Sequence, residues 1–398
     1  MARKNTHVRR MSLEALESRE LKAGNVSVSV VNEELRVVGD NNANQIEIHQ
    51  SVGNLYKVTG LNGTKINGKE DKLFSFKGGI SVDLKSGDDK FVMGGVLFND
   101  DVHGNLNVTM GAGKDKVILG KVNVQGTTTI NTDNDADQVT LDGSYRTLNV
   151  NTGAGDDVVN TSTLLANNFN LNLGAGADST KIEFSSIDNT LDIQSSTEAD
   201  SITLNHAFGD RIRIDSGTGK DSVLLKNQTQ SNDLRVNSGA DADTVEFNEY
   251  GPFGGTVAVD TADGDDIVRV KNSRINNNAE FKTGSGNDQV LFDTTHVAGN
   301  LRIETANGKD TIDLTKLTLS SEKDITILTG DGDDIVRFNQ VVADELFADL
   351  GKDRDEFRLR DTTLRVAKIN GGNNTDKFFD LLGNHITTLD VVDFEQLF

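Results

Sequence analysis

Apolar and polar residues alternate along most of the chain, and short polar turns interrupt the alternation at regular intervals. Between Thr329 and Phe338 a glycine-rich turn ends at Asp334, and apolar residues follow it at the second and fourth positions. The same arrangement recurs about every 22 residues, and a fixed period of this length, marked by turn residues, indicates a solenoid. We call the fourteen repeated aspartates the anchor aspartates: Asp89, Asp115, Asp137, Asp157, Asp178, Asp200, Asp221, Asp243, Asp266, Asp288, Asp310, Asp334, Asp355 and Asp376.

The positions around each anchor predict two strands in every coil. All fourteen residues seven places before an anchor are apolar, as are thirteen of those two places after it and twelve of those four places after it. The position between them, three after the anchor, often carries a charge, as at Glu246 and Arg337. A period of two predicts strands that bury one face, which a helix with 3.6 residues per turn would not do.

The rest of each coil carries a looser apolar contact, such as Val124, Ile187, Val297 or Leu317, and predicts a short third strand or a bridging loop. Because each strand lies one coil away from its equivalent, the strands should pair in parallel. The preferred hand of parallel crossovers then gives the winding direction. The predicted fold class is therefore all-β, a right-handed parallel β-helix with coils of about 22 residues.

The same period divides the chain into four parts. Residues 1–24 form a basic, targeting-like N-terminal segment, for which a short amphipathic helix is the simplest interpretation; residues 25–79 form an N-terminal cap with degenerate coils. Residues 80–385 hold the regular repeats, and 386–398 a C-terminal cap that either closes the last coil or docks on a following subunit end to end. Asn44 occupies the anchor position of a first coil, and its distance from Asp89 predicts one further coil, without an anchor, in residues 50–78.

Charge and composition narrow the possible partners. The formal net charge is −22, which disfavours nucleic acid and the bare surface of an anionic membrane and favours divalent cations or basic partners. Cysteine and tryptophan are absent and only three tyrosines occur, so thiolate metal sites are excluded and aromatic stacking clefts are disfavoured. No apolar stretch is long enough to form a transmembrane helix.

The anchor turns are the candidate functional sites, and two interpretations of them remain open. An anchor aspartate can accept hydrogen bonds from N–H groups of its own turn, or the stacked carboxylates can bind calcium together with turn carbonyls, a hard-oxygen ligand set. Acidic residues are densest in three pairs of neighbouring coils. Those candidate ligands are Asp133, Asp135, Asp137, Asp156, Asp157, Asp241, Asp243, Asp263, Asp265, Asp266, Asp331, Asp333, Asp334, Asp353 and Asp355.

Two short resemblances add to this interpretation. Gly153–Val159 and Gly284–Val290 resemble the calcium-binding RTX repeat, G-x-G-x-D-x-U, and the resemblance implies that Asp157 and Asp288 would be calcium ligands. The motif occurs here once per coil of about 22 residues rather than every nine, so only one edge could carry such sites. Leu13–Gly24 is similar to the LEPR-XLL segment at the start of repetitive surface or exported proteins of planctomycete bacteria, although Ser18 replaces its proline and Lys22 its leucine.

These observations favour a non-enzymatic, extracellular or cell-surface solenoid with a structural or adhesive role, whose partners are divalent cations, cell-wall or surface components, or like subunits. The alternative is a polysaccharide-active β-helix, a lyase or hydrolase, which would need aromatic and basic side chains gathered on one flank. The six histidines fall at unrelated positions, and no serine or cysteine nucleophile motif is present. Tyr250 and Phe253, in the loop around Pro252, either contact a partner or fold onto the solenoid.

Overall fold

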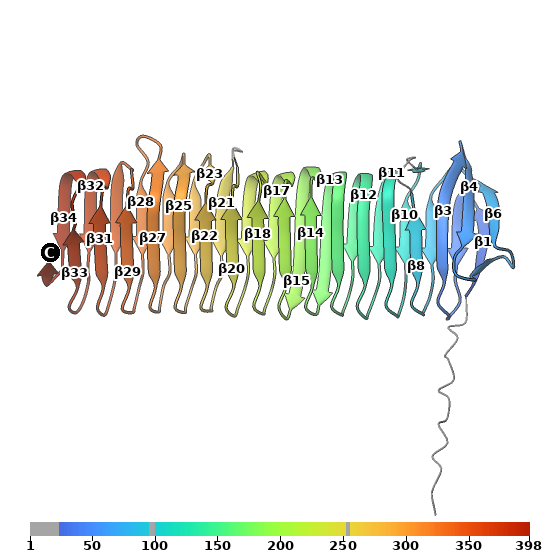
Figure 1. The fold of residues 1–398 in the computed structure, drawn as a ribbon, viewed down its shortest axis with the longest axis horizontal. Helices are drawn as coiled ribbons and strands as arrows, with labels where there is room; N and C mark the ends of the chain where they lie inside the picture. Colours follow the sequence, from blue (N-terminus) through green and yellow to red (C-terminus); the bar gives the residue numbers. More distant parts are fainter. Residues whose placement is uncertain (1–23, 95–99, 252–254) are drawn as a thin grey trace, which may run out of the picture.

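The computed structural model describes residues 24–94, 100–251 and 255–398, which form one elongated stack of β coils (Figure 1). Equivalent residues of successive coils pair in parallel, as in the series Val108, Ile130, Val150 and Leu171. This arrangement confirms the predicted all-β parallel solenoid with a repeat of about 22 residues, whereas its right-handedness stays a prediction. Among the described residues, no helix is long and apolar enough to cross a membrane.

One file of strands leads into the anchor turns. It comprises β2 (Glu34–Val38), β7 (Ile80–Asp83), β10 (Leu106–Thr109), the last parts of β11 (Lys116–Asn131), β12 (Gln138–Asn151), β13 (Val158–Ala175), β15 (Ser186–Thr197), β17 (Phe208–Asp215) and β19 (Gln230–Asn237), then β21 (Thr256–Asp260), β24 (Ala279–Lys282), β26 (Leu301–Glu304), β28 (Ile325–Leu328), β30 (Glu345–Asp349), β32 (Thr363–Asn370) and β34 (His385–Val392). We call these the pre-turn strands.

A second file leaves the anchor turns. These post-turn strands are β3 (Gln45–Val52), β8 (Lys90–Met93), the first parts of β11, β12 and β13, β14 (Ser179–Glu183), β16 (Ser201–Asn205), β18 (Ser222–Lys226), β20 (Thr244–Asn248), β22 (Ile267–Lys271), the first parts of β25 (Gln289–Val297) and β27 (Thr311–Leu319), β29 (Ile335–Asn339), β31 (Glu356–Arg360), β33 (Lys377–Asp380) and β35 (Gln396–Leu397). A third, short file contains β9 (Asp100–Val102), β23 (Arg274–Ile275) and the remaining parts of the longer strands.

The core is one continuous apolar column inside the coils. Alternate residues of each strand point inward, and the apolar residues seven before and two after each anchor are buried with few exceptions. Val124, Ile187, Val297 and Leu317 are also buried and lie on short third strands. In the coil that follows Asp243, the described residues form no third strand, so both predicted forms of this segment occur. Burial of these side chains drives the coils to stack, because no single coil can cover its own apolar face.

The N-terminal end differs from the prediction. Residues 50–78 do not form a coil: β3, β4 (Leu55–Gly60) and β6 (Asp71–Ser75) pair antiparallel, while β1 (Asn25–Val31) pairs antiparallel with β2 and parallel with the short β5 (Lys65–Ile66). Asn44 does occupy an anchor position, but its coil stacks directly on the coil of Asp89. These antiparallel strands end the parallel stack at its N-terminal side, so no further coil follows there. Natural sheets protect their edges in such ways, which limits edge-to-edge association.

Three further predictions concern particular segments. β34 and β35 pair in parallel with β32 and β33, so residues 386–398 build a last coil, and its role toward a following subunit stays a prediction. Tyr250 is buried and its hydroxyl contacts the Ser231 hydroxyl at 2.9 Å, so it is no partner contact; Phe253 lies outside the described residues. The LEPR-XLL-like segment and the expected N-terminal helix lie outside them too.

Candidate metal site in the anchor turns

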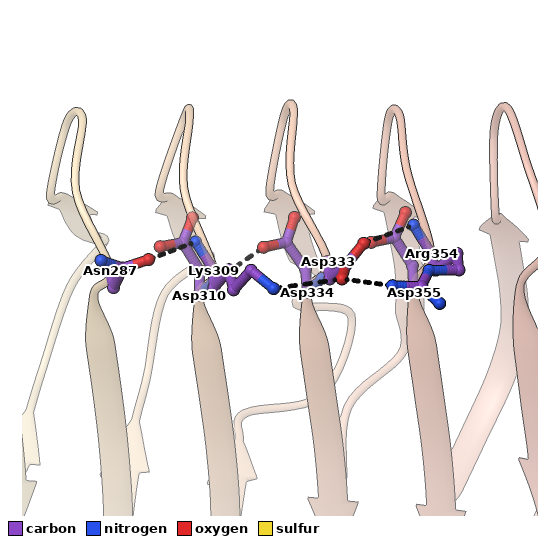
Figure 2. A network of polar contacts seen from close by, with 7 residues as sticks. All are labelled: Asn287, Lys309, Asp310, Asp333, Asp334, Arg354 and Asp355. Carbon is purple, nitrogen blue, oxygen red and sulfur yellow. Dashed lines mark hydrogen bonds and ion pairs between the residues drawn. The ribbon is translucent and has the colours of Figure 1, made fainter.

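The anchor aspartates form a buried file along one edge of the solenoid. All fourteen are at most 3% exposed. One carboxylate oxygen of each, Oδ1, accepts a hydrogen bond from the backbone N–H of the anchor in the preceding coil, at 2.6–2.9 Å. Figure 2 shows three members, Asp310, Asp334 and Asp355, pointing along the stack in this way. The expectation that an anchor bonds N–H groups of its own turn is therefore wrong, because the bond links neighbouring coils.

The other oxygen of every anchor, Oδ2, is buried without a hydrogen-bond partner. Removing a carboxylate from water disfavours its charged form, and neighbouring anchor charges act in the same direction for most of the file. Burial therefore raises the pKa of ten anchors to about 6, 7 or 8 and raises the pKa of the other four as well. At pH 7 the eight anchors whose pKa is raised to about 7 or 8 hold protons for much of the time unless a cation replaces them.

Asn44 shows which groups surround the position of the second oxygen. In its coil an amide nitrogen stands there, and Nδ2 donates to three backbone carbonyls: Asp40 at 2.9 Å, Asn42 at 2.7 Å and Leu84, of the following coil, at 3.2 Å. An amide NH₂ suits such a set, because it has donors where the surroundings have only acceptors. In nine of the later coils, a hydroxyl five residues before the anchor acts on the carboxylate as a donor and lowers its pKa, although burial raises it by more.

A file of hydroxyls runs beside the anchors, five residues before them. Most of its members donate to the backbone carbonyl of the equivalent residue in the following coil; Thr329, for example, reaches the Leu350 carbonyl at 2.8 Å. The chain carries this file in its sequence, and reading the residues before each anchor could have found it. Its members are Thr132, Thr152, Ser195, Ser216, Ser238, Thr261, Thr283, Thr305 and Thr329.

A separate, outer file consists of the residues immediately before the anchors. Where that residue is Asp or Asn, its side chain accepts the backbone N–H of the equivalent residue in the next coil, as Asp333 accepts from Arg354 at 3.2 Å (Figure 2). Asp333 also pairs with the guanidinium of Arg354 at 3.1 Å and with the ammonium of Lys309 at 3.2 Å. The Arg354 N–H, Lys309 and the Arg354 guanidinium together lower the pKa of Asp333 to about 2. Asp333 and its neighbour Asp334 are thus oppositely perturbed.

The predicted metal ligands separate into three groups. Asp137, Asp157, Asp243, Asp266, Asp288, Asp334 and Asp355 belong to the buried file. Asp156, Asp265 and Asp333 belong to the outer file and accept N–H groups there. The remaining ones lie elsewhere on the turn surface: Asp133, Asp135, Asp241 and Asp353 adopt positive φ, as the glycines of other turns do, Asp263 is exposed, and Asp331 pairs with Lys352.

The geometry does not gather several acids around one point. Across residues 24–94, 100–251 and 255–398, no three His, Cys, Asp or Glu side chains converge closely enough to hold an ion between them. A cation in the buried file would therefore depend on carboxylates of neighbouring coils and on backbone carbonyls. That donor set fits calcium, which accepts six to eight oxygen ligands, many of them carbonyls.

Glu395 is a member of the file that the sequence did not reveal. Its Oε2 accepts the backbone N–H of Asp376 at 2.7 Å, as an anchor carboxylate does in every earlier coil. The signal available was weak: Gln396 and Leu397 follow it in β35, but the turn before it lacks glycine.

Comparisons with known proteins give limited information. No family model matches the chain, and no curated protein matches it. Among solved structures, the chain is similar to the crystal structure of a hyperactive, Ca²⁺-dependent, β-helical antifreeze protein from an Antarctic bacterium. The TM-score is 0.43 and the identity 18%, over 72% of this chain and 81% of that one.

Proposed function

We propose that this chain is a non-enzymatic structural or adhesive rod, located outside the cell or on its surface, that takes up calcium along its anchor edge. The observation that carries the proposal is the buried file of fourteen carboxylates, each with one oxygen that has no partner. The antifreeze β-helix is described as Ca²⁺-dependent. For the present chain, the case for calcium depends on its own anchor residues.

The electrostatics of the file favour a cation. Neighbouring coils lie ~4.8 Å apart, so two ionised anchors repel by roughly 3.5 kcal/mol at an effective dielectric of about 20. Lys309, which precedes the anchor Asp310, pairs with the outer Asp333 rather than with the buried file. The anchor side chains would hold the ion together with backbone carbonyls, and calcium would supply the missing positive charge.

The surface favours a scaffold over an enzyme. A polysaccharide-active site would require aromatic and basic side chains gathered on one flank. From Asn105 to Asn172 the outward face of the pre-turn strands carries only asparagine and threonine. Basic side chains do occur farther along this face, but Arg235, Lys282 and Arg302 pair there with carboxylates. The aromatic cluster of Phe247, Tyr250 and Phe281 is buried in the core.

Thermal unfolding followed by circular dichroism tests the proposal. Calcium that binds only the folded chain stabilises it by about 2.7 kcal/mol at 100 times its dissociation constant. We expect Tm to rise with calcium, to fall with chelator, and to respond far less to the same concentration of magnesium, which retains its water shell. Equal melting curves in calcium and in chelator would refute calcium binding. Surface labelling of intact cells tests the location separately.

A further inference from the structure

A second surface, away from the anchor edge, has an unusual composition. The outward positions of the pre-turn strands β10, β11, β12 and β13, with the residue before β10, form a grid of four coils by three residues. Charged residues make up 26% of the chain, so about three would be expected among twelve positions, yet the grid has none. We call it the Asn/Thr face: Asn105, Asn107, Thr109, Thr127, Thr129, Asn131, Thr147, Asn149, Asn151, Asn168, Asn170 and Asn172.

Four asparagine side chains of this face are held in position by hydrogen bonds between neighbouring coils. Asn149 pairs in register with Asn170, and Asn151 with Asn172. The Nδ2 of Asn170 donates to Oδ1 of Asn149 at 2.7 Å, and the Nδ2 of Asn172 donates to Oδ1 of Asn151 at 2.8 Å. Each amide has two N–H donors and an oxygen with two lone pairs. After these bonds, Asn170 and Asn172 keep one N–H and two lone pairs each, and Asn149 and Asn151 keep two N–H groups and one lone pair each. These groups can bind a ligand at little further cost in side-chain entropy.

The face is hollow rather than flat. A depression of about 440 Å³ is lined by Asn131, Asn149, Asn151, Asn170 and Asn172, with Asp192 and Gln194 at its end. Asp192 and Gln194 also line a larger hollow of about 1030 Å³, which continues along the next pre-turn strands as far as Thr326. The larger hollow differs in chemistry, because charged side chains such as Arg213, Arg235 and Lys282 line it. The Asn-lined depression itself crosses several coils, so it suits a long ligand lying along the solenoid axis.

The chemistry of the Asn-lined depression limits what fits it. Nucleic acid and anionic polymers need cations, which the Asn/Thr face lacks, and the net charge of −22 opposes them. Protein interfaces have an apolar core, whereas this face presents amides and hydroxyls. We infer that the Asn/Thr face binds an uncharged, hydroxyl-rich polysaccharide through hydrogen bonds repeated from coil to coil. This inference is independent of calcium binding at the anchor edge.

The absence of aromatic rings from the face has a consequence for affinity. Sugar rings commonly stack on aromatic side chains, and none of the twelve residues provides such a platform. Each sugar unit therefore binds weakly, and useful affinity arises only when many units engage neighbouring coils at once. Binding should depend steeply on chain length, with long polymers retained and short oligosaccharides not.

Affinity electrophoresis of the whole chain tests this inference. Each gel contains one neutral polymer: hydroxyethyl cellulose, dextran, galactomannan or xylan. A further gel contains carboxymethyl cellulose, which is the charged counterpart of hydroxyethyl cellulose. We expect retardation by at least one neutral polymer, no retardation by carboxymethyl cellulose, and competition by long but not by short oligosaccharides. No retardation by any neutral polymer, or retardation by carboxymethyl cellulose as well, overturns the inference.

Two double variants locate the site. Asn151→Ala with Asn172→Ala should weaken binding at least tenfold, since one hydrogen-bonding group is worth about fivefold. Thr129→Val with Thr147→Val, which keeps strand propensity, should also weaken it and guards against misfolding of the first variant. The matched control is Thr140→Ala with Asn160→Ala, a pair in register on the post-turn parts of β12 and β13.

The outcomes separate this site from other roles of the same residues. Binding that weakens in both face variants and not in the control supports the inference. A lower Tm in the first variant with unchanged polymer binding shows that the amide pairs only stabilise the stack, and overturns it. If no polymer retards the wild type, and the wild type shapes ice crystals while the face variants do not, the face binds ice instead and the inference is overturned.

Discussion

Replacing one anchor aspartate by asparagine should stabilise the protein without calcium and destabilise it with calcium. Asp288 suits this test because it lies in the middle of the file and is fully buried. In Asp288→Asn, Oδ1 can still accept the backbone N–H of Asp266, a bond of 2.8 Å in the wild type. The new Nδ2 takes the position of the oxygen that has no partner, where the Nδ2 of Asn44 donates to carbonyls.

The size and sign of the effect follow from the pKa of Asp288. Burial, followed by the charges of Asp310 and Asp266, raises this pKa from 3.8 to about 7. The folded chain therefore keeps a proton that the unfolded chain has lost, and the stability due to that proton is present below pH 4 and lost as pH rises to 7. At about 1.4 kcal/mol per pKa unit, two units between pH 5 and pH 7 amount to ~2.5 kcal/mol.

Urea unfolding at pH 5 and pH 8, with chelator and with calcium, measures the effect. In chelator, we expect the free energy of unfolding of Asp288→Asn, relative to the wild type, to rise by ~2.5 kcal/mol from pH 5 to pH 8. In calcium at pH 8 the order should reverse, because the variant has lost a ligand. Asp288→Ala is the control, since it leaves the Asp266 N–H without a partner and should be less stable throughout. Equal effects of Asn and Ala at every pH would refute the reasoning.

Three further substitutions test the surrounding turn. Asp333→Asn should lower Tm by no more than about 2 °C and lose that effect in high salt, because its pairing with Arg354 is exposed; a large, salt-independent loss would contradict this. Gly332→Ala should lower the free energy of unfolding by more than ~3 kcal/mol in urea, since φ is +146° and a Cβ would lie 1.5 Å from the Gly308 carbonyl oxygen. A fully stable variant would show that the coils are less tightly stacked. Thr329→Val should cost ~1–2 kcal/mol in the same assay, because it leaves a buried carbonyl without its donor, and an unchanged urea midpoint would contradict that role.

Much of the fold could be predicted because the repeat constrains it many times over. The same pattern of inward and outward positions recurs in every coil, so one exception such as Thr180 does not obscure it. Thr180 is itself buried, and its hydroxyl donates to the Val159 carbonyl at 2.9 Å. The N-terminal cap could not be predicted in this way. Residues 50–78 alternate like any strand, and alternation alone does not distinguish a parallel coil from an antiparallel excursion.

The sequence predicted the positions of the candidate site residues, but not their hydrogen-bond partners or the shifts in their pKa values. The repeat identified the anchors, and stacking in register implied a file of carboxylates. It did not show that Oδ1 would bond the coil before, since a turn can satisfy its N–H groups locally or across coils. Nor did it separate Asp333 from Asp334: adjacent aspartates read alike, while in the folded turn one faces solvent and cations and the other is buried, so their pKa values shift in opposite directions.

The central claim is that the buried anchor carboxylates bind calcium, and that those with a pKa of about 7 or 8 release protons as they do so. Calorimetric titration of calcium at pH 7, repeated in buffers of different ionisation enthalpy, counts both the ions bound and the protons released by each chain. The account predicts several calcium ions per chain, with protons released as they bind. Binding of one ion or none, without proton release, would contradict it.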